Sequence, residues 1–178
     1  RELKIKHVGN NSLVTSQPVK ELSTTYSKTS AVQNIRITKK LDVAAKVGKL
    51  KLPCIVNLNA EEIKDFSMVL SNDMGEELVI GYDKNQNQYF IDRTKSGKID
   101  FQKDFAARHV APRLSDNAKM EISLVIDASS VELFADDGLT VMTSVFFPNK
   151  PYSKIHIQST DNLLIKKLEY ISLKSIWK

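Results

Sequence analysis

Short segments in which apolar and polar residues alternate dominate this sequence, and the clearest of them follow one another between residues 122 and 148. Ile122, Leu124 and Ile126 fall on one face of the first segment, and the second segment alternates in the same way. Alternation with a period of two residues predicts a β-strand that buries one face. The period of 3.6 residues that indicates amphipathic helices hardly occurs, so we expect a chain built from strands.

The two connections inside this region carry turn signals of their own. Residues 127–130 read Asp-Ala-Ser-Ser, and Asp and Ser side chains can hydrogen-bond their own backbone two residues on. Asp136-Asp137-Gly138 is a hairpin signal, because glycine readily takes the positive φ that such turns need. Pro148 ends the third strand. We therefore expect a three-stranded antiparallel unit.

About a dozen such segments, separated by turn signals, run along the whole chain. This spacing predicts an all-β fold, a two-sheet antiparallel β-sandwich, in which each strand has one polar face. Residues 50–58 read as the cleanest strand, and the run through Leu41, Val43 and Ala45 also alternates. Residues 59–64 are expected to form one helical turn capped by Asn59, and residues 93–112 a long crossing loop.

Composition excludes several classes of function. The 178 residues suffice for one domain with its own core, and no apolar run approaches the roughly 20 residues that span a membrane. The net charge is +5, but the lysines are scattered, which argues against nucleic-acid binding. The single cysteine, Cys54, lies in an alternating stretch and is expected to be a buried thiol. The chain does not begin with Met, so we expect a piece of a longer protein.

The region 122–148 resembles the C-terminal β-sandwich module of glycoside hydrolase family 32, the fructan-degrading invertases, levanases and inulinases. These modules carry a hairpin of the form Asp-x-Ser-Ser-Val-Glu-hydrophobic-Phe-x-x-Asp/Asn-Gly, followed by Thr and an aromatic-Pro ending. The matching residues are Asp127, Ser129, Ser130, Val131, Glu132, Phe134, Asp137, Gly138, Thr143, Phe147 and Pro148. The resemblance implies a concanavalin-like jelly roll in which this hairpin has a structural role.

Matches outside the hairpin extend the resemblance over most of the chain. Upstream they include Asp92-Arg93, Ser96-Gly97, Phe105 and Arg108, and the segment from Leu173 to Trp177 resembles the family's closing segment. The start of the chain resembles the family's passage from its N-terminal β-propeller. The resemblance thus implies a passage segment over residues 1–30 and a β-sandwich domain over residues 31–178. Trp177, close to the end of this sequence, is expected to cap the core or to pack on the neighbouring domain.

No catalytic residue is expected in this chain. A retaining glycosidase needs two carboxylates about 5–5.5 Å apart, and the family carries them in propeller motifs (Asn-Asp-Pro, Arg-Asp-Pro and Glu-Cys) that this sequence lacks. Asp127 and Glu132 flank one turn and form an alternative pair. We favour a structural role, in which Asp127 accepts backbone N–H groups and Glu132 faces outward or pairs with Arg93 or Arg108. The three histidines lack metal-ligand spacing, so no metal or cofactor is expected.

The resemblance implies that the module stabilises the catalytic propeller of a fructan β-fructosidase. Two alternatives remain open: a fructan-binding module, in which Tyr82, Tyr89 and Tyr152 would stack on sugar rings, and an oligomerisation module that pairs through sheet edges. The implied partners are the chain's own propeller and a fructan polymer, with no nucleic acid and no membrane span. An extracytoplasmic location, whether secreted, periplasmic or on the cell surface, is expected from the resemblance alone.

Overall fold

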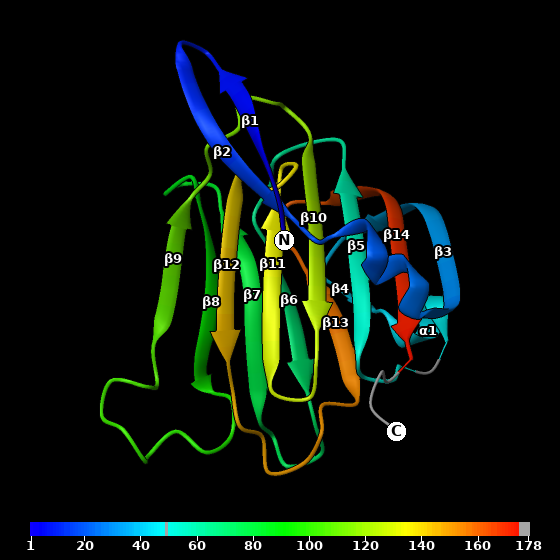
Figure 1. Ribbon diagram of the computed structural model, residues 1–178. Coiled ribbons are helices and arrows are strands. Elements are labelled where there is room, and N and C mark those ends of the chain that lie inside the picture. Colours follow the sequence, from blue (N-terminus) through cyan, green and yellow to red (C-terminus); the bar gives the residue numbers. More distant parts are fainter. Residues whose placement is uncertain (49, 175–178) are drawn as a thin grey trace.

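The computed structural model describes residues 1–48 and 50–174, which form two packed antiparallel sheets and a separate two-stranded hairpin (Figure 1). We call the sheet nearer the viewer in Figure 1 the front sheet; its order is β12-β11-β10-β5-β14-β3. The back sheet has the order β4-β13-β6-β7-β8-β9. The prediction of an all-β, two-sheet antiparallel sandwich is confirmed. The Trp177 prediction lies outside the described residues.

Most of the strands are short, although β3 and β14 have 12 and 11 residues. The front sheet contains β12 (Thr140–Val145), β11 (Ser130–Ala135), β10 (Met120–Ile126), β5 (Cys54–Ala60), β14 (Leu163–Leu173) and β3 (Tyr26–Ile37). The back sheet contains β4 (Lys40–Asp42), β13 (Lys154–Gln158), β6 (Phe66–Ser71), β7 (Glu77–Asp83), β8 (Gln88–Lys95) and β9 (Arg108–Pro112). The remaining elements are β1 (Glu2–Val8), β2 (Asn11–Gln17), the 3₁₀ helix η1 (Lys20–Thr25) and α1 (Ala44–Val47).

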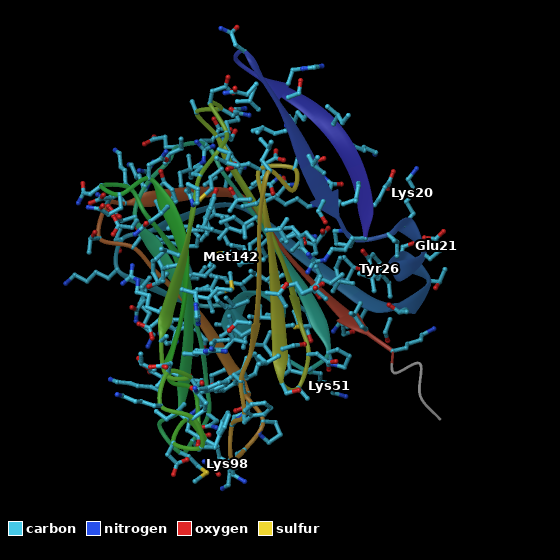
Figure 2. The ribbon with its side chains drawn as sticks, turned by 60° about the vertical axis from the view of Figure 1, so that its left-hand side comes forward. Lys20, Glu21, Tyr26, Lys51, Lys98 and Met142 are labelled. Atoms are coloured by element: carbon cyan, nitrogen blue, oxygen red, sulfur yellow. The ribbon has the colours of Figure 1, made fainter. Side chains whose placement is uncertain are left out.

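The core lies between the sheets and is supplied by every second residue. On β10 the inward residues Ile122, Leu124 and Ile126 are at most 4% exposed, and the residues between them are more open. Burial of apolar surface contributes about 25 cal/mol per Å², so this alternation fixes which face of each strand turns inward. Figure 2 shows Met142 of β12 among the side chains between the two layers, and Lys98 at one end of the sandwich.

Cys54 is the first residue of β5 and is fully buried, which confirms the expected core thiol. Burial raises its pKa to about 12. The strand expected from residue 50 thus begins at residue 54, after Pro53.

Three local predictions were wrong. The sequence 59–64 forms no helical turn, because β5 continues to Ala60 in register with β10 and β14. Residues expected as a strand near Val43 form the short helix α1, where the Asp42 carboxylate accepts the Ala44 N–H at 2.9 Å. The long loop expected over residues 93–112 is shorter, because β8 runs to residue 95 and β9 occupies 108–112.

The hairpin of β1 and β2 crosses the outer face of the front sheet and projects beyond one end of the sandwich (Figure 1). Leu3, Ile5 and Val14 share one of its faces, because Ile5 pairs with Val14 and Leu3 lies two residues before Ile5. They are 66%, 72% and 65% exposed. β3 begins at Tyr26 and pairs with β14 from its first residue, so the front sheet starts before residue 31. The division at residue 30 stays a prediction.

Candidate functional site

The turn from β11 to β12 is where the family-like motif meets the rest of the molecule. Asp136, Asp137 and Gly138 have φ values of 52°, 61° and 76°, all in the left-handed region. The Gly138 N–H donates to the carbonyl of Ala135 at 3.0 Å and closes the turn. Aspartate tolerates this conformation better than most residues, and glycine has no Cβ to oppose it. The predicted hairpin turn is confirmed.

Asp136 holds a buried ion pair at this turn. The Nε of Arg113 lies 2.9 Å from Asp136 Oδ2, and both side chains are 3% exposed. The Tyr89 hydroxyl donates to the same oxygen at 2.8 Å. Burial, and after it the Asp136 carboxylate, raises the pKa of Tyr89 well above its ordinary value. The carboxylate therefore joins β8, β9 and the β11–β12 turn.

Arg113 also orders the loop that leads to β10. Its guanidinium donates to the carbonyls of Ser115, Asn117 and Lys119 at 2.9, 2.8 and 3.0 Å. A buried guanidinium needs such partners because each unsatisfied donor costs free energy. No sequence pattern pointed to this arginine, which lies 23 residues from Asp136, and a single Arg after a proline carries no local signal.

The same turn binds the β1–β2 hairpin. Ser16 N–H donates to the Gly138 carbonyl at 3.0 Å, and Lys6 Nζ lies 2.9 Å from Asp137 Oδ2. A Cβ on Gly138 would stand 2.1 Å from the carbonyl oxygen of Ser16. Glycine is thus required here for a close backbone approach as well as for its positive φ.

Glu132 pairs with Arg1, which also donates to the Thr143 hydroxyl at 2.7 Å. Glu132 thus faces outward with a basic partner, as expected, but this partner is Arg1 and neither Arg93 nor Arg108. Those guanidiniums lie over aromatic rings instead, Arg93 at 3.9 Å from the Phe105 centroid and Arg108 at 3.7 Å from that of Phe90. Arg1 is 131 residues from Glu132, so only the folded hairpin brings the two together.

The other motif residues make turn and core contacts. Asp127 Oδ1 accepts the Ala128 N–H at 2.7 Å, and its own N–H donates to the Ser130 carbonyl at 2.9 Å. The Ser129 carbonyl accepts the Phe146 N–H at 3.0 Å. Val131 is fully buried, and Phe134 is 4% exposed beneath Arg1. Asp127 and Glu132 thus each have a structural partner, as expected if they are not a catalytic pair.

Tyr82, Tyr89 and Tyr152 are core residues, at 3%, 0% and 6% exposed. Their hydroxyls donate inward, to the Asn87 side chain at 2.8 Å, to Asp136, and to the Ser96 carbonyl at 3.0 Å. None of the three presents an exposed ring face on which a sugar could stack. The described residues therefore do not provide the exposed tyrosine rings that the fructan-binding alternative requires.

Within residues 1–48 and 50–174, no three or more His, Cys, Asp or Glu side chains are grouped so that they could hold a metal ion. The helices in these two ranges are also all too short or too polar to cross a membrane.

Comparison with known proteins gives relatives of one kind. A levanase of Bacillus subtilis (strain 168) is 26% identical over 182 residues, which cover 99% of this chain and 27% of the levanase. An extracellular exo-inulinase of Aspergillus niger is 36% identical over 91 residues, or 51% of this chain and 17% of the inulinase. This chain thus spans about a quarter or less of the length of these relatives.

Solved structures give the same fold. An exo-inulinase of Aspergillus awamori superposes with a TM-score of 0.81 at 23% identity, covering 99% of this chain and 35% of that one. Fructan 1-exohydrolase IIa of Cichorium intybus superposes with a TM-score of 0.75 at 15% identity, covering 94% and 40%. The family model described as glycosyl hydrolases family 32 C terminal matches residues 12–175. Since that match covers most of the chain, the protein belongs to glycosyl hydrolase family 32, and these residues are its C-terminal β-sandwich domain.

Proposed function

We propose that this chain is the non-catalytic sandwich of a β-fructosidase that hydrolyses levan, inulin or sucrose, and that its work is to stabilise a catalytic β-propeller. In this proposal residues 1–30 lead from the propeller and residues 31–178 form the sandwich. The names of the relatives support the substrate class, and their greater length leaves room for a catalytic domain. The name of the extracellular exo-inulinase supports an extracytoplasmic location.

The exposed apolar face of the β1–β2 hairpin is the observation that carries this proposal. Leu3, Ile5 and Val14 are each about two-thirds exposed or more, although they share one face of a two-stranded sheet. An isolated hairpin is marginally stable at best, and a contiguous apolar patch marks an interaction site. The opposite face carries Lys6, which is held by Asp137 of the sandwich. The hairpin is therefore anchored on one side and open on the other.

A stable contact at this face would bury about 1,000 Å² or more in total. Apolar burial contributes about 25 cal/mol per Å² before the costs of association, so such a contact stabilises both domains.

The test compares the 178-residue chain with the protein that includes the preceding catalytic domain. Only the longer protein should hydrolyse levan, inulin or sucrose. Leu3→Ser together with Ile5→Ser should lower its thermal midpoint by several degrees, and should change the unfolding free energy of the shorter chain by less than about 0.5 kcal/mol, as exposed positions usually do. Hydrolysis by the shorter chain, or equal effects on both proteins, would contradict the proposal.

A further inference from the structure

The outer face of the back sheet carries a row of residues that crosses five strands. Lys40 of β4 pairs with Gln158 of β13, Gln158 with Ser67 of β6, Ser67 with Gly81 of β7, and Gly81 with Phe90 of β8. Each has a buried or partly buried core residue beside it along its strand, so the row faces away from the core.

The middle of this row is recessed from the surface, because Ser67 has a small side chain and Gly81 has none. A Cβ on Gly81 would stand 2.3 Å from the Phe66 carbonyl oxygen and 2.6 Å from Phe90 Cζ, so the Phe90 ring lies across the glycine. Arg108 of β9 covers that ring, with its guanidinium 3.7 Å from the ring centroid. Phe90 and Arg108 form one wall of a groove of about 620 Å³, which Lys39, Lys40 and Gln158 border as well. We call it the back-sheet groove. Small-ligand sites typically measure about 300–1,000 Å³.

The walls of the groove offer hydrogen-bond donors and acceptors in balance. Lys39, Lys40 and Arg108 donate, Asp65 and Asp83 accept, and Gln158 can do both. One oxygen of each aspartate accepts a backbone N–H, from Lys84 at 2.8 Å and from Gln86 at 3.1 Å. Among the described residues, the second carboxylate oxygen of each has no hydrogen-bond partner.

This lining suits an uncharged ligand that both donates and accepts hydrogen bonds. Three cations and two carboxylates nearly cancel, so a polyanion gains little net attraction there. Adjacent hydroxyl groups on a sugar ring both donate and accept hydrogen bonds, which suits carboxylates and an amide beside cations. The carbon-bound hydrogens of such a ring can pack on the part of the Phe90 ring that Arg108 leaves open, since that ring is 8% exposed.

We propose that the back-sheet groove binds a neutral, hydroxyl-rich sugar chain. It lies on the face of the sandwich opposite the sheet that the β1–β2 hairpin contacts through Glu132 and Thr143. Sugar binding there is thus compatible with a propeller on the hairpin. Tyr82 borders the groove, but its ring is buried, so exposed polar side chains make the contact. Only the choice of levan and inulin as first probes rests on the proposed function.

Electrophoresis of the full chain through native gels that contain levan, inulin or dextran tests this site. We expect retardation by at least one of these neutral polysaccharides, little changed by added salt. Gln158→Ala and Arg108→Ala each remove an exposed side chain and should weaken retention about three- to tenfold, the factor for one lost hydrogen bond.

Matched controls come from β3 of the front sheet, where Gln33 and Arg36 are also exposed. Gln33→Ala and Arg36→Ala should be retarded like the unaltered chain, and thermal midpoints verify that all four variants fold. A further gel contains heparin, a polyanion. Retardation by none of the three neutral polysaccharides would overturn the proposal. Retardation by heparin alone, or equal losses in the control pair, would overturn it as well. Loss of the propeller-stabilising effect would leave these gels unchanged, so the two proposals fail separately.

Discussion

The buried pair of Arg113 and Asp136 gives the sharpest test of how this sandwich is held together. Asp136→Asn removes the negative charge but keeps a side chain that tolerates the left-handed backbone at this position, where φ is 52°. The Arg113 charge then stays buried without a counter-ion, since its other contacts are backbone carbonyls. Breaking a buried pair by neutralising one partner costs about 3–5 kcal/mol.

Asp137→Asn is the matched control, because Asp137 is the next residue in the same turn and also has a positive φ, 61°. Its pair with Lys6 is exposed, with side chains 41% and 59% accessible, and such pairs contribute about 0–1 kcal/mol. Thermal unfolding at low and high salt separates the two cases. We expect Asp136→Asn to lower the thermal midpoint by roughly 6–20 °C in either salt, and Asp137→Asn to have a small effect that salt removes. Equal losses below about 1 kcal/mol in both variants would refute the reasoning.

Three further predictions concern single residues. Gly138→Ala should destabilise the folded chain more than Gly75→Ala does, and should speed protease cleavage of the β1–β2 hairpin. Both glycines have a φ near 76°, but only at Gly138 would a Cβ meet Ser16. Equal effects of the two variants in unfolding and proteolysis assays would contradict this. Burial, and after it the charge of Lys40, lowers the pKa of His156, although the carboxylates of Glu77 and Asp42 act in the opposite direction. Below about pH 6.5 the unfolded chain therefore binds more protons than the folded chain, so the free energy of unfolding falls as the pH falls. Urea unfolding between about pH 7 and pH 5 should show a shallower fall for His156→Gln, and identical slopes would count against that assignment. The Cys54 thiol, with its pKa raised to about 12, should react with a thiol reagent near pH 8 only after unfolding, so rapid labelling of the native protein would show the burial to be wrong.

Local sequence predicted the parts of the fold whose causes are local. The strands β10 to β12 follow from alternation, and the turn at Gly138 follows from residues that accept a positive φ. Strand β9 was missed because it is an edge strand whose residues are mostly exposed, so it shows no alternation. Helix α1 was missed because the run through Leu41, Val43 and Ala45 alternates as a strand does, whereas the chain turns into the helix where the Asp42 carboxylate accepts the Ala44 N–H.

The candidate sites were less predictable for the same reason. Arg113 and Asp136 meet from different strand ends, and Arg1 meets Glu132 from the other end of the sequence. The back-sheet groove depends on strand order, which places residues 40, 158, 67, 81 and 90 side by side, and no sequence spacing encodes that order. The burial of Tyr82, Tyr89 and Tyr152 likewise follows from how the two sheets pack, which no spacing in the sequence encodes.

The position of β14 in the front sheet has a consequence for biosynthesis. This strand is inserted between β3 and β5, and Ile37 of β3 pairs with Leu163 of β14. Translation at about 5–20 residues per second therefore takes roughly 6–25 seconds to proceed from Ile37 to Leu163. From the time that β5 has been made until β14 follows, the nascent chain holds two strands whose shared neighbour is missing, and unpaired strand edges of this kind invite aggregation. The sandwich is thus expected to close only after its last strand has left the ribosomal exit tunnel, and holdase chaperones would act in the time before.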